Sequence, residues 1–205
     1  MMKIHIVGDG SFGSFLKKLL EQEFTISDDA PSVIMAVPVS AYDSVAARYS
    51  DRHLINVCSV QRPSMDMALR HTRNVTGIHP LFGSRTPADH RNSILTYTLA
   101  AESDVEPSFI QAEEDFLAAF EKLSRIIRDD PDGKSFTPDS HDRLMAKTHV
   151  AAVLAAKQMK VFVERAENIP DEFLPNSFRL MREFVKTLDD MPQGTIESIM
   201  ANPYF

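Results

Sequence analysis

Near its N-terminus the chain carries three glycines at a fixed spacing, in the segment Gly8-Asp9-Gly10-Ser11-Phe12-Gly13. Residues 3–7 before this segment form a short apolar run that predicts a strand, and residues 15–20 after it have the apolar spacing of a helix. In such a strand–loop–helix unit the first glycine allows a tight turn, the second lets the backbone approach a pyrophosphate, and the third lets the helix pack closely on the strand. The helix N-terminus adds N–H donors. The segment therefore predicts a dinucleotide site, and a purely structural glycine turn is the alternative.

Two further strands are predicted directly after this unit, at residues 23–26 and 33–38. The few residues between them leave no room for the helix that usually joins parallel strands, so this half of the nucleotide-binding unit is predicted to be shortened. Asp28 follows the first of these strands, where an acid can bind the adenosine ribose, although a solvated turn is an equal interpretation. Val37 and Pro38 end the second strand and are predicted to contact the cofactor. No Arg follows Asp28 to accept a 2′-phosphate, which favours NAD and leaves NADP possible.

The remaining segments alternate between strand and helix up to a turn at residues 129–134, Asp-Asp-Pro-Asp-Gly-Lys, and are helical after it. Strands are predicted at 53–58, 74–78, 93–100 and 124–128, and helices at 41–49, 65–70, 107–123, 140–166, 171–189 and 195–200. This order predicts an α/β fold, with a Rossmann-like, doubly wound, mostly parallel sheet in residues 1–134 and a small all-α domain in residues 135–205.

Composition limits the classes of function. The chain has 205 residues and a formal net charge of −7, which argues against nucleic-acid and anionic-membrane partners because both require a basic surface. Its single cysteine, Cys58, excludes an intramolecular disulfide framework and a Cys-rich zinc site. His141 and His149 lack a carboxylate at ligand spacing, so no metal site is predicted. No apolar stretch reaches membrane-span length, and no signal peptide is recognised, so a cytoplasmic location is expected.

Two motifs carry candidate chemistry, and each follows a predicted strand. They are Asn56-Val57-Cys58-Ser59-Val60-Gln61 and Gly77-Ile78-His79-Pro80-Leu81-Phe82-Gly83. A histidine between an apolar run and a proline is poorly explained by packing, and imidazole is suited to general-base catalysis because its unperturbed pKa of about 6.5 is close to neutral pH. A buried, hydrogen-bonded His79 and a Ser59 that merely caps the next segment are the alternatives.

Together with the glycine loop and the segment Ser140-His141-Asp142-Arg143-Leu144-Met145-Ala146, these motifs resemble the prephenate and arogenate dehydrogenases of tyrosine biosynthesis. The resemblance implies NAD(P)-dependent oxidative decarboxylation, with His79 as the base and Ser59 hydrogen-bonded to it or to the substrate hydroxyl. It also implies that His141 and a basic residue of the C-terminal helices bind the substrate. Arg179, Arg182 and Lys186 are the candidates for that basic residue. Without the resemblance, His141 and Asp142 are equally explained as first-turn residues of a helix.

The sequence departs from that family in three respects, of which Leu81 in place of the common methionine is a mild change. Gln61 replaces the usual lysine, which removes a positive charge near an anionic substrate, and the chain ends at Phe205, before helices that the family uses for its dimer and its site. A homodimer through the C-terminal helices is therefore expected, with a cyclic carboxylate as the small-molecule substrate. The alternative function is a dinucleotide-binding accessory or sensor protein with little or no dehydrogenase activity. A dehydrogenase of the wider β-hydroxyacid type is a third possibility.

Overall fold

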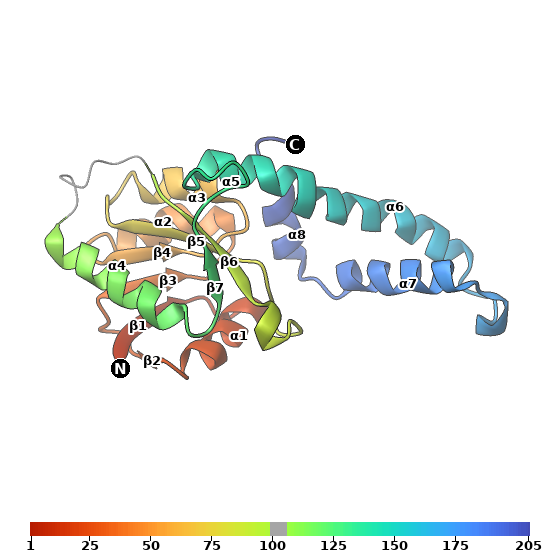
Figure 1. Ribbon diagram of the computed structural model, residues 1–205, viewed down its shortest axis with the longest axis horizontal. Helices are drawn as coiled ribbons and strands as arrows, with labels where there is room; N and C mark the ends of the chain where they lie inside the picture. The colour runs from red at the N-terminus through yellow and green to blue at the C-terminus, as the bar shows by residue number, and fades with distance from the viewer. Residues whose placement is uncertain (99–105) are drawn as a thin grey trace. The chain divides into compact units, whose positions relative to one another are not determined.

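The computed structural model describes residues 1–98 and 106–205, and the chain divides into two compact units, Met1–Asp142 and Arg143–Phe205. The first unit contains a sheet and the helices that cover it, and the second is helical (Figure 1). The division falls after Asp142, inside a helix, because His141 and Asp142 make their contacts within the first unit. The domain boundary predicted at residue 134 lies before this division and stays a prediction.

In the described part of the first unit, seven strands form one sheet in the order β2-β1-β3-β4-β5-β6-β7. The first five strands are parallel, β6 is antiparallel to β5, and β7 is parallel to β6. This topology confirms the predicted Rossmann-like, mostly parallel sheet. The strands are β1 (Met2–Val7), β2 (Phe24–Ile26), β3 (Ser32–Met35), β4 (His53–Asn56), β5 (Val75–Pro80), β6 (Asn92–Thr96) and β7 (Arg125–Ile127).

Helices cover both faces of the sheet because successive strand residues are apolar and point to opposite faces. In β3, Ile34 belongs to the core cluster that includes residues of α1 (Ser11–Leu20) and α4 (Pro107–Phe120). Val33 belongs to the cluster that includes residues of α2 (Tyr42–Arg48) and Ala68 of α3 (Gln61–Ala68). A continuous apolar run in a strand is thus explained by burial on both sides. Two short 3-10 turns, η1 (Val39–Ala41) and η2 (Ala88–His90), connect these elements.

The connection from β2 to β3 contains no helix, as the sequence predicted, and side chains from elsewhere cover it. Arg52 Nη1 donates to the carbonyl oxygens of Asp28 and Ala30, at 2.7 and 3.3 Å. The guanidinium of Arg52 lies 5.2 Å from the ring centre of Tyr49, and the Tyr49 hydroxyl is 3.3 Å from His5 Nε2 in β1. These polar and aromatic side chains thus cover the β2–β3 connection, where a crossover helix is usually found.

His79 lies inside β5, whereas the sequence predicted a strand that ends just before it. The strand continues because β6 pairs with it in antiparallel fashion, with Ile94 opposite His79 and Ser93 opposite Pro80. The partner strand was predicted at 93–100 and is observed at Asn92–Thr96, and residues 99 and 100 of that prediction lie outside the described ranges.

The helical segment contains each of the three predicted helices, but the first is interrupted. Helix α5 (Pro138–Met145) leads through a π-helical turn (Ala146–Val150) into α6 (Ala151–Arg165). The predicted capped start is confirmed, since the Thr137 and Ser140 side-chain oxygens each accept from the other residue's backbone N–H. A 3-10 turn η5 (Asp171–Phe173), α7 (Asn176–Asp189) and α8 (Gln193–Met200) follow, and α6 packs against α7 (Figure 1).

Within residues 1–98 and 106–205, no helix is both long and apolar enough to cross a membrane. The same residues contain no group of three or more His, Cys, Asp or Glu side chains arranged to hold a metal ion.

Candidate active site

The glycine loop adopts a conformation that only residues without a Cβ allow. Gly8 has a φ of +118°, and a Cβ built on it would lie 2.1 Å from the carbonyl oxygen of Ala36. A Cβ on Gly13 would lie 2.3 Å from the carbonyl oxygen of Gly8. The loop, the start of α1 and the end of β3 are therefore packed backbone against backbone, which explains the first and third glycines of the motif. Val37 adjoins this contact, with its Cγ1 3.3 Å from the position of a Cβ on Gly8.

Gly10, by contrast, faces open space. No atom lies within 4 Å of a Cβ built on it, and Gly10 is the N-cap residue of α1. The first turn of α1 contains no acidic residue, so its N–H groups and the positive end of the helix dipole are available to an anion. Asp9, Ser11 and Pro38 are exposed around the loop, and Phe12 is half-buried. A closely packed cradle with one open glycine fits a dinucleotide pyrophosphate.

Asp28 lies just beyond the end of β2, and its side chain is almost fully exposed, at 99%. Its carboxylate oxygen is 3.1 Å from Nδ1 of His5. The neighbouring Asp29 is engaged otherwise, because it accepts from the Ser27 hydroxyl and pairs with Lys3 at 3.2 Å. Of the two acids at this turn, Asp28 therefore remains the candidate for the adenosine ribose, as the sequence predicted.

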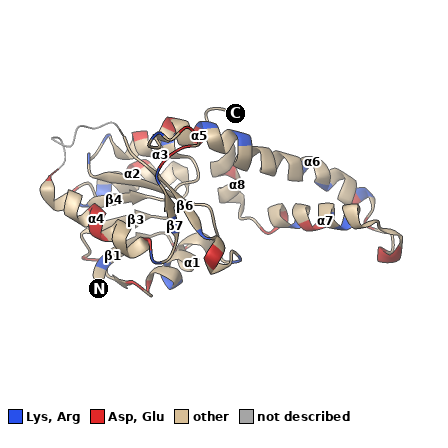
Figure 2. Cartoon of the chain, viewed as in Figure 1, with Lys and Arg blue, Asp and Glu red and all other residues tan. Residues whose placement is uncertain are grey.

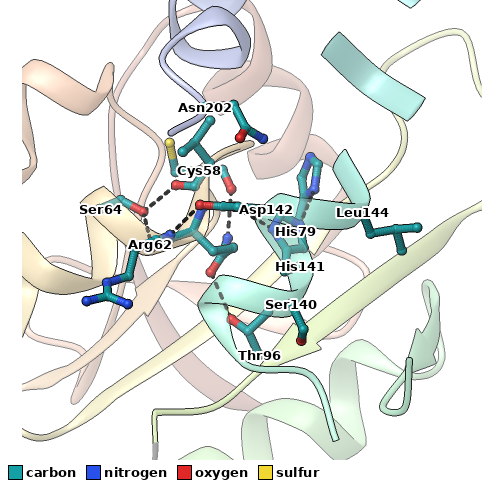
Figure 3. A network of polar contacts seen from close by, with 12 residues as sticks. Cys58, Arg62, Ser64, His79, Thr96, Ser140, His141, Asp142, Leu144 and Asn202 are labelled. Carbon is teal, nitrogen blue, oxygen red and sulfur yellow. Dashed lines mark hydrogen bonds and ion pairs between the residues drawn. The ribbon is translucent and has the colours of Figure 1, made fainter. Parts of the chain in front are cut away.

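A line of three side chains extends from β5 into the start of α5. Nδ1 of His79 lies 2.9 Å from Nε2 of His141, and Nδ1 of His141 lies 2.7 Å from a carboxylate oxygen of Asp142 (Figure 3). All three residues are buried. Both ring nitrogens of His141 thus have protein partners. In this structure the His141 ring faces His79, and the prediction that His141 binds the substrate stays a prediction.

Asp142 also connects this line to helix α3. Its two carboxylate oxygens accept the backbone N–H groups of Gln61 and Arg62, each at 2.8 Å. Residues 61 and 62 are the first two of α3, so Asp142 caps this helix from a position about 80 residues further along the chain. The sequence placed the helix start at residue 65, because the residue at the N-cap, Val60, has no side chain that can accept a hydrogen bond.

Gln61 is fully buried and does not contribute to a surface that a substrate could reach. Its side-chain Nε2 donates to the carbonyl oxygen of Cys58 at 2.7 Å, and its Oε1 accepts from Thr96 at 2.9 Å and from Asn56 at 3.3 Å. A Cβ at Gly77 would lie 2.5 Å from that same Oε1, so the glycine before Ile78 provides the space for this side chain. Gln61, at the position where the resemblance implies a lysine, is thus a neutral, hydrogen-bonded core group.

Ser59 lies in the bend between β4 and α3 and is half-buried. Its catalytic role stays a prediction. The adjacent Cys58 is buried, and burial raises the pKa of its thiol to about 11, so it is a neutral core residue at physiological pH.

The three basic candidates for substrate binding all lie on α7. Arg182 Nη2 is 2.9 Å from a carboxylate oxygen of Asp171, and Arg179 Nη2 donates to the carbonyl oxygen of Asp171 at 2.8 Å. Lys186 is exposed, and the described residues include no ion-pair partner for it. The choice among the three stays a prediction.

Comparison with solved structures identifies similar folds at low sequence identity. The chain is similar to a Corynebacterium glutamicum protein assigned as a prephenate dehydrogenase, with a TM-score of 0.70, 15% identity, and coverage of 97% of this chain and 73% of the other. Synechocystis arogenate dehydrogenase has a TM-score of 0.63, 16% identity, and coverage of 98% and 84%. Aquifex aeolicus prephenate dehydrogenase has a TM-score of 0.59, 14% identity, and coverage of 98% and 87%.

No family model matches the sequence, and a search of curated proteins finds no match. The likeness therefore concerns the fold. In fold, the chain resembles prephenate and arogenate dehydrogenases, the proteins to which its motifs pointed.

Proposed function

We propose that this chain is an NAD(P)-dependent dehydrogenase in which His79 removes the proton of a substrate hydroxyl. The observation that carries the proposal is the position of His79 in the sheet. β1, which leads into the glycine loop, and β5, which contains His79, are parallel strands separated by β3 and β4. Three strand spacings correspond to about 14 Å, and ligands of open parallel sheets bind along the carboxyl edge that the two strands share.

The residues of the loop fit the cofactor. Gly10 and the first turn of α1 would hold the pyrophosphate, Asp28 would bind the adenosine ribose, and Val37 and Pro38 would line the site beside Gly8. When bound, a nicotinamide accepts a hydride from the carbon that bears the substrate hydroxyl. The task of the chain is to hold that carbon in place and to accept the hydroxyl proton on His79. Ser59 is assigned a hydrogen bond to the substrate hydroxyl.

For the substrate we propose prephenate or arogenate, supported by the His79 segment and by the names of the three similar structures. Oxidation of the ring carbon that bears the hydroxyl, with loss of the ring carboxylate as carbon dioxide, yields an aromatic phenol. Formation of the aromatic ring supplies much of the driving force. Arg179, Arg182 or Lys186 would bind a substrate carboxylate.

The test is the absorbance of the reduced nicotinamide, measured with prephenate and separately with arogenate, and with NAD and then NADP. We expect turnover with one of these pairs. His79→Asn should reduce turnover by roughly 10²–10⁴-fold, the usual contribution of general-base catalysis, with little change in NAD affinity by calorimetry. His90→Asn is the matched control, because the His90 side chain is 73% exposed. An unchanged rate in His79→Asn contradicts the assignment of the base.

The alternative is a dinucleotide-binding sensor or accessory protein, and the buried, neutral Gln61 favours it because the family's lysine is absent. Binding of NAD without turnover on any of these substrates would support that alternative. Turnover only on an unrelated hydroxy acid would instead indicate a dehydrogenase of the wider β-hydroxyacid type. If neither nucleotide binds, the glycine loop is only a structural turn.

A further inference from the structure

We infer that Asp142, acting through His141, is a positioning residue that keeps the proton of neutral His79 on Nδ1 and leaves Nε2 as the basic nitrogen. The catalytic meaning of this inference rests on the proposed function. The position of the proton does not, because it follows from hydrogen bonds within the first unit.

The carboxylate of Asp142 fixes one end of the line. Ionised aspartate can only accept hydrogen bonds. It accepts from the backbone N–H groups of Gln61 and Arg62, each at 2.8 Å, at the N-terminus of α3, where the helix dipole favours a negative charge. The 2.7 Å contact from Asp142 to His141 Nδ1 therefore also requires a donor, which places a proton on Nδ1 of His141.

The donor and acceptor roles then follow along the line. A neutral imidazole with a proton on Nδ1 has a lone pair on Nε2, so Nε2 of His141 is an acceptor. This nitrogen lies 2.9 Å from Nδ1 of His79, which must carry the hydrogen of that bond. His79 is then protonated on Nδ1 and basic on Nε2. The opposite arrangement would place two buried lone pairs against each other, which leaves both nitrogens without a hydrogen bond.

This assignment has a chemical consequence for the base. When Nε2 of His79 accepts the substrate proton, the positive charge on the imidazolium is hydrogen-bonded through neutral His141 to the carboxylate of Asp142. The carboxylate thus stabilises the charged base, and no proton needs to leave His79. In this way a side chain that caps one helix controls the base on a neighbouring strand.

The same unit contains a histidine with the opposite arrangement, which serves as an internal reference. The Thr76 hydroxyl donates to Glu113, at 2.5 Å, so its oxygen must accept from His53 Nε2, at 2.8 Å. His53 Nδ1 then accepts from the Ser32 hydroxyl at 3.1 Å. His53 is therefore protonated on Nε2, and none of its hydrogen bonds involves Asp142.

The decisive measurement is a ¹⁵N–¹H NMR correlation of the imidazole nitrogens in the wild-type protein, above the pH at which they titrate. We expect Nδ1–H for His79 and His141, and Nε2–H for His53. Nε2–H on His79 in the wild-type protein overturns the inference without any variant and without any assay of activity.

Asp142→Asn provides the second arm. An amide cannot accept from both backbone N–H groups and from His141, so His79 should shift to a mixture of tautomers while His53 stays unchanged. The amide resonances of Gln61 and Arg62 should move as well. The matched control is Asp139→Asn, which removes a carboxylate from the same helix and breaks the 2.7 Å pair with the Arg62 side chain. If His79 keeps Nδ1–H in a folded Asp142→Asn variant, Asp142 does not set the tautomer.

Kinetics give a separate readout if the dehydrogenase assay succeeds. Asp142→Asn should lower kcat/KM by about 10²-fold, as loss of an orienting partner commonly does. It should also move the acid limb of the pH profile to lower pH, because the imidazolium of His79 loses its stabilising charge. A lower rate with an unmoved limb would indicate a merely structural role for Asp142. Absence of wild-type turnover together with Nδ1–H on His79 would contradict the proposed function alone. Turnover together with Nε2–H on His79 would contradict the inference alone, so the two failures are distinguishable.

Discussion

At position 61 the chain buries a neutral side chain where the dehydrogenases that it resembles carry a lysine. The carboxamide of Gln61 both donates and accepts, and it holds together β4, the α3 start and β6 through Cys58, Asn56 and Thr96. A lysine could not accept from Asn56 or Thr96, and its ammonium would be buried. The substitution is thus part of a local hydrogen-bond system and is not a simple loss of surface charge.

We therefore expect Gln61→Lys to destabilise the protein by about 3 kcal/mol or more, from unsatisfied donors and a buried charge. Urea unfolding followed by circular dichroism measures this change. Gln22→Lys, at an exposed position, is the control and should stay within about 0.5 kcal/mol of the wild type. Equal stability of the two variants would show that the side chain at position 61 can turn outward.

The roles of single residues were predictable where the side chain itself, or its neighbours in the sequence, determines the role. The glycines at 8 and 13 follow from the absence of a Cβ, and His79 was singled out by its place between an apolar run and a proline. The role of His141 was not predictable, because it depends on which nitrogen faces His79 after the chain has folded. The role of Asp142 as the cap of α3 was not predictable either, because the sequence shows Asp142 only as an ordinary acidic residue near the start of a helix.

Among the secondary-structure elements, a series of hydrogen bonds links β3, β4, β5 and α4 through buried Ser32, His53 and Thr76 and half-buried Glu113. Burial lowers the pKa of His53 from 6.5 to about 4. Burial also raises the pKa of Glu113, against the lowering effect of the hydrogen bond from Thr76. The protonation of His53 and Glu113 therefore makes the stability of the contacts among these four elements depend on pH.

The sign of the His53 effect follows from proton binding. Below pH 6.5 the unfolded state binds a proton on His53, and the folded state does not until about pH 4. Stability from this group is therefore complete above pH 6.5 and is lost as the pH falls to 4, by about 3 kcal/mol. Glu113 acts in the opposite direction, since its contribution is present at low pH and is lost as the pH rises.

His53→Gln should flatten the pH dependence of the unfolding free energy between pH 4 and 6.5, because an amide does not titrate. Urea titrations at a series of pH values measure the slope. His90→Gln, at an exposed site, should leave the slope unchanged. A His53→Gln slope equal to that of the wild type would contradict the lowered pKa of His53.

The helices and strands themselves were predictable from local sequence patterns, but the residues at which some of them begin and end were not. The shortened connection after β2 could be foreseen from chain length alone. The earlier start of α3 and the continuation of β5 through His79 could not, because a distant aspartate and an antiparallel neighbour strand determine them. The π-helical turn between α5 and α6 has no evident sequence signal.

For the molecule as a whole, charges of both signs are mixed on the surface, and several large apolar side chains are exposed. Lys and Arg alternate with Asp and Glu over both units (Figure 2). In the helical unit, Phe162, Phe173 and Leu180 are exposed at 56%, 72% and 57%. In the same unit, Leu174, Val185 and Leu188 are buried. We propose that the exposed side chains are covered by a second copy of this chain.

Light scattering at micromolar concentration should therefore give the mass of a dimer. Leu180→Glu should shift the equilibrium to the monomer, because a charge in an apolar interface is costly to desolvate. Thr187→Glu, at an exposed polar position of the same helix, is the control. A wild-type monomer would contradict the proposal.

The cap on α3 has a consequence for how the proposed active site forms. The bonds from Asp142 to the α3 backbone join residues 81 and 80 positions apart in the chain. Closing such long loops is slow compared with forming helices and neighbouring strand pairs. A nascent or refolding chain can therefore build much of its sheet before the proton on His79 is placed, and recovery of catalysis during refolding should lag behind recovery of secondary structure.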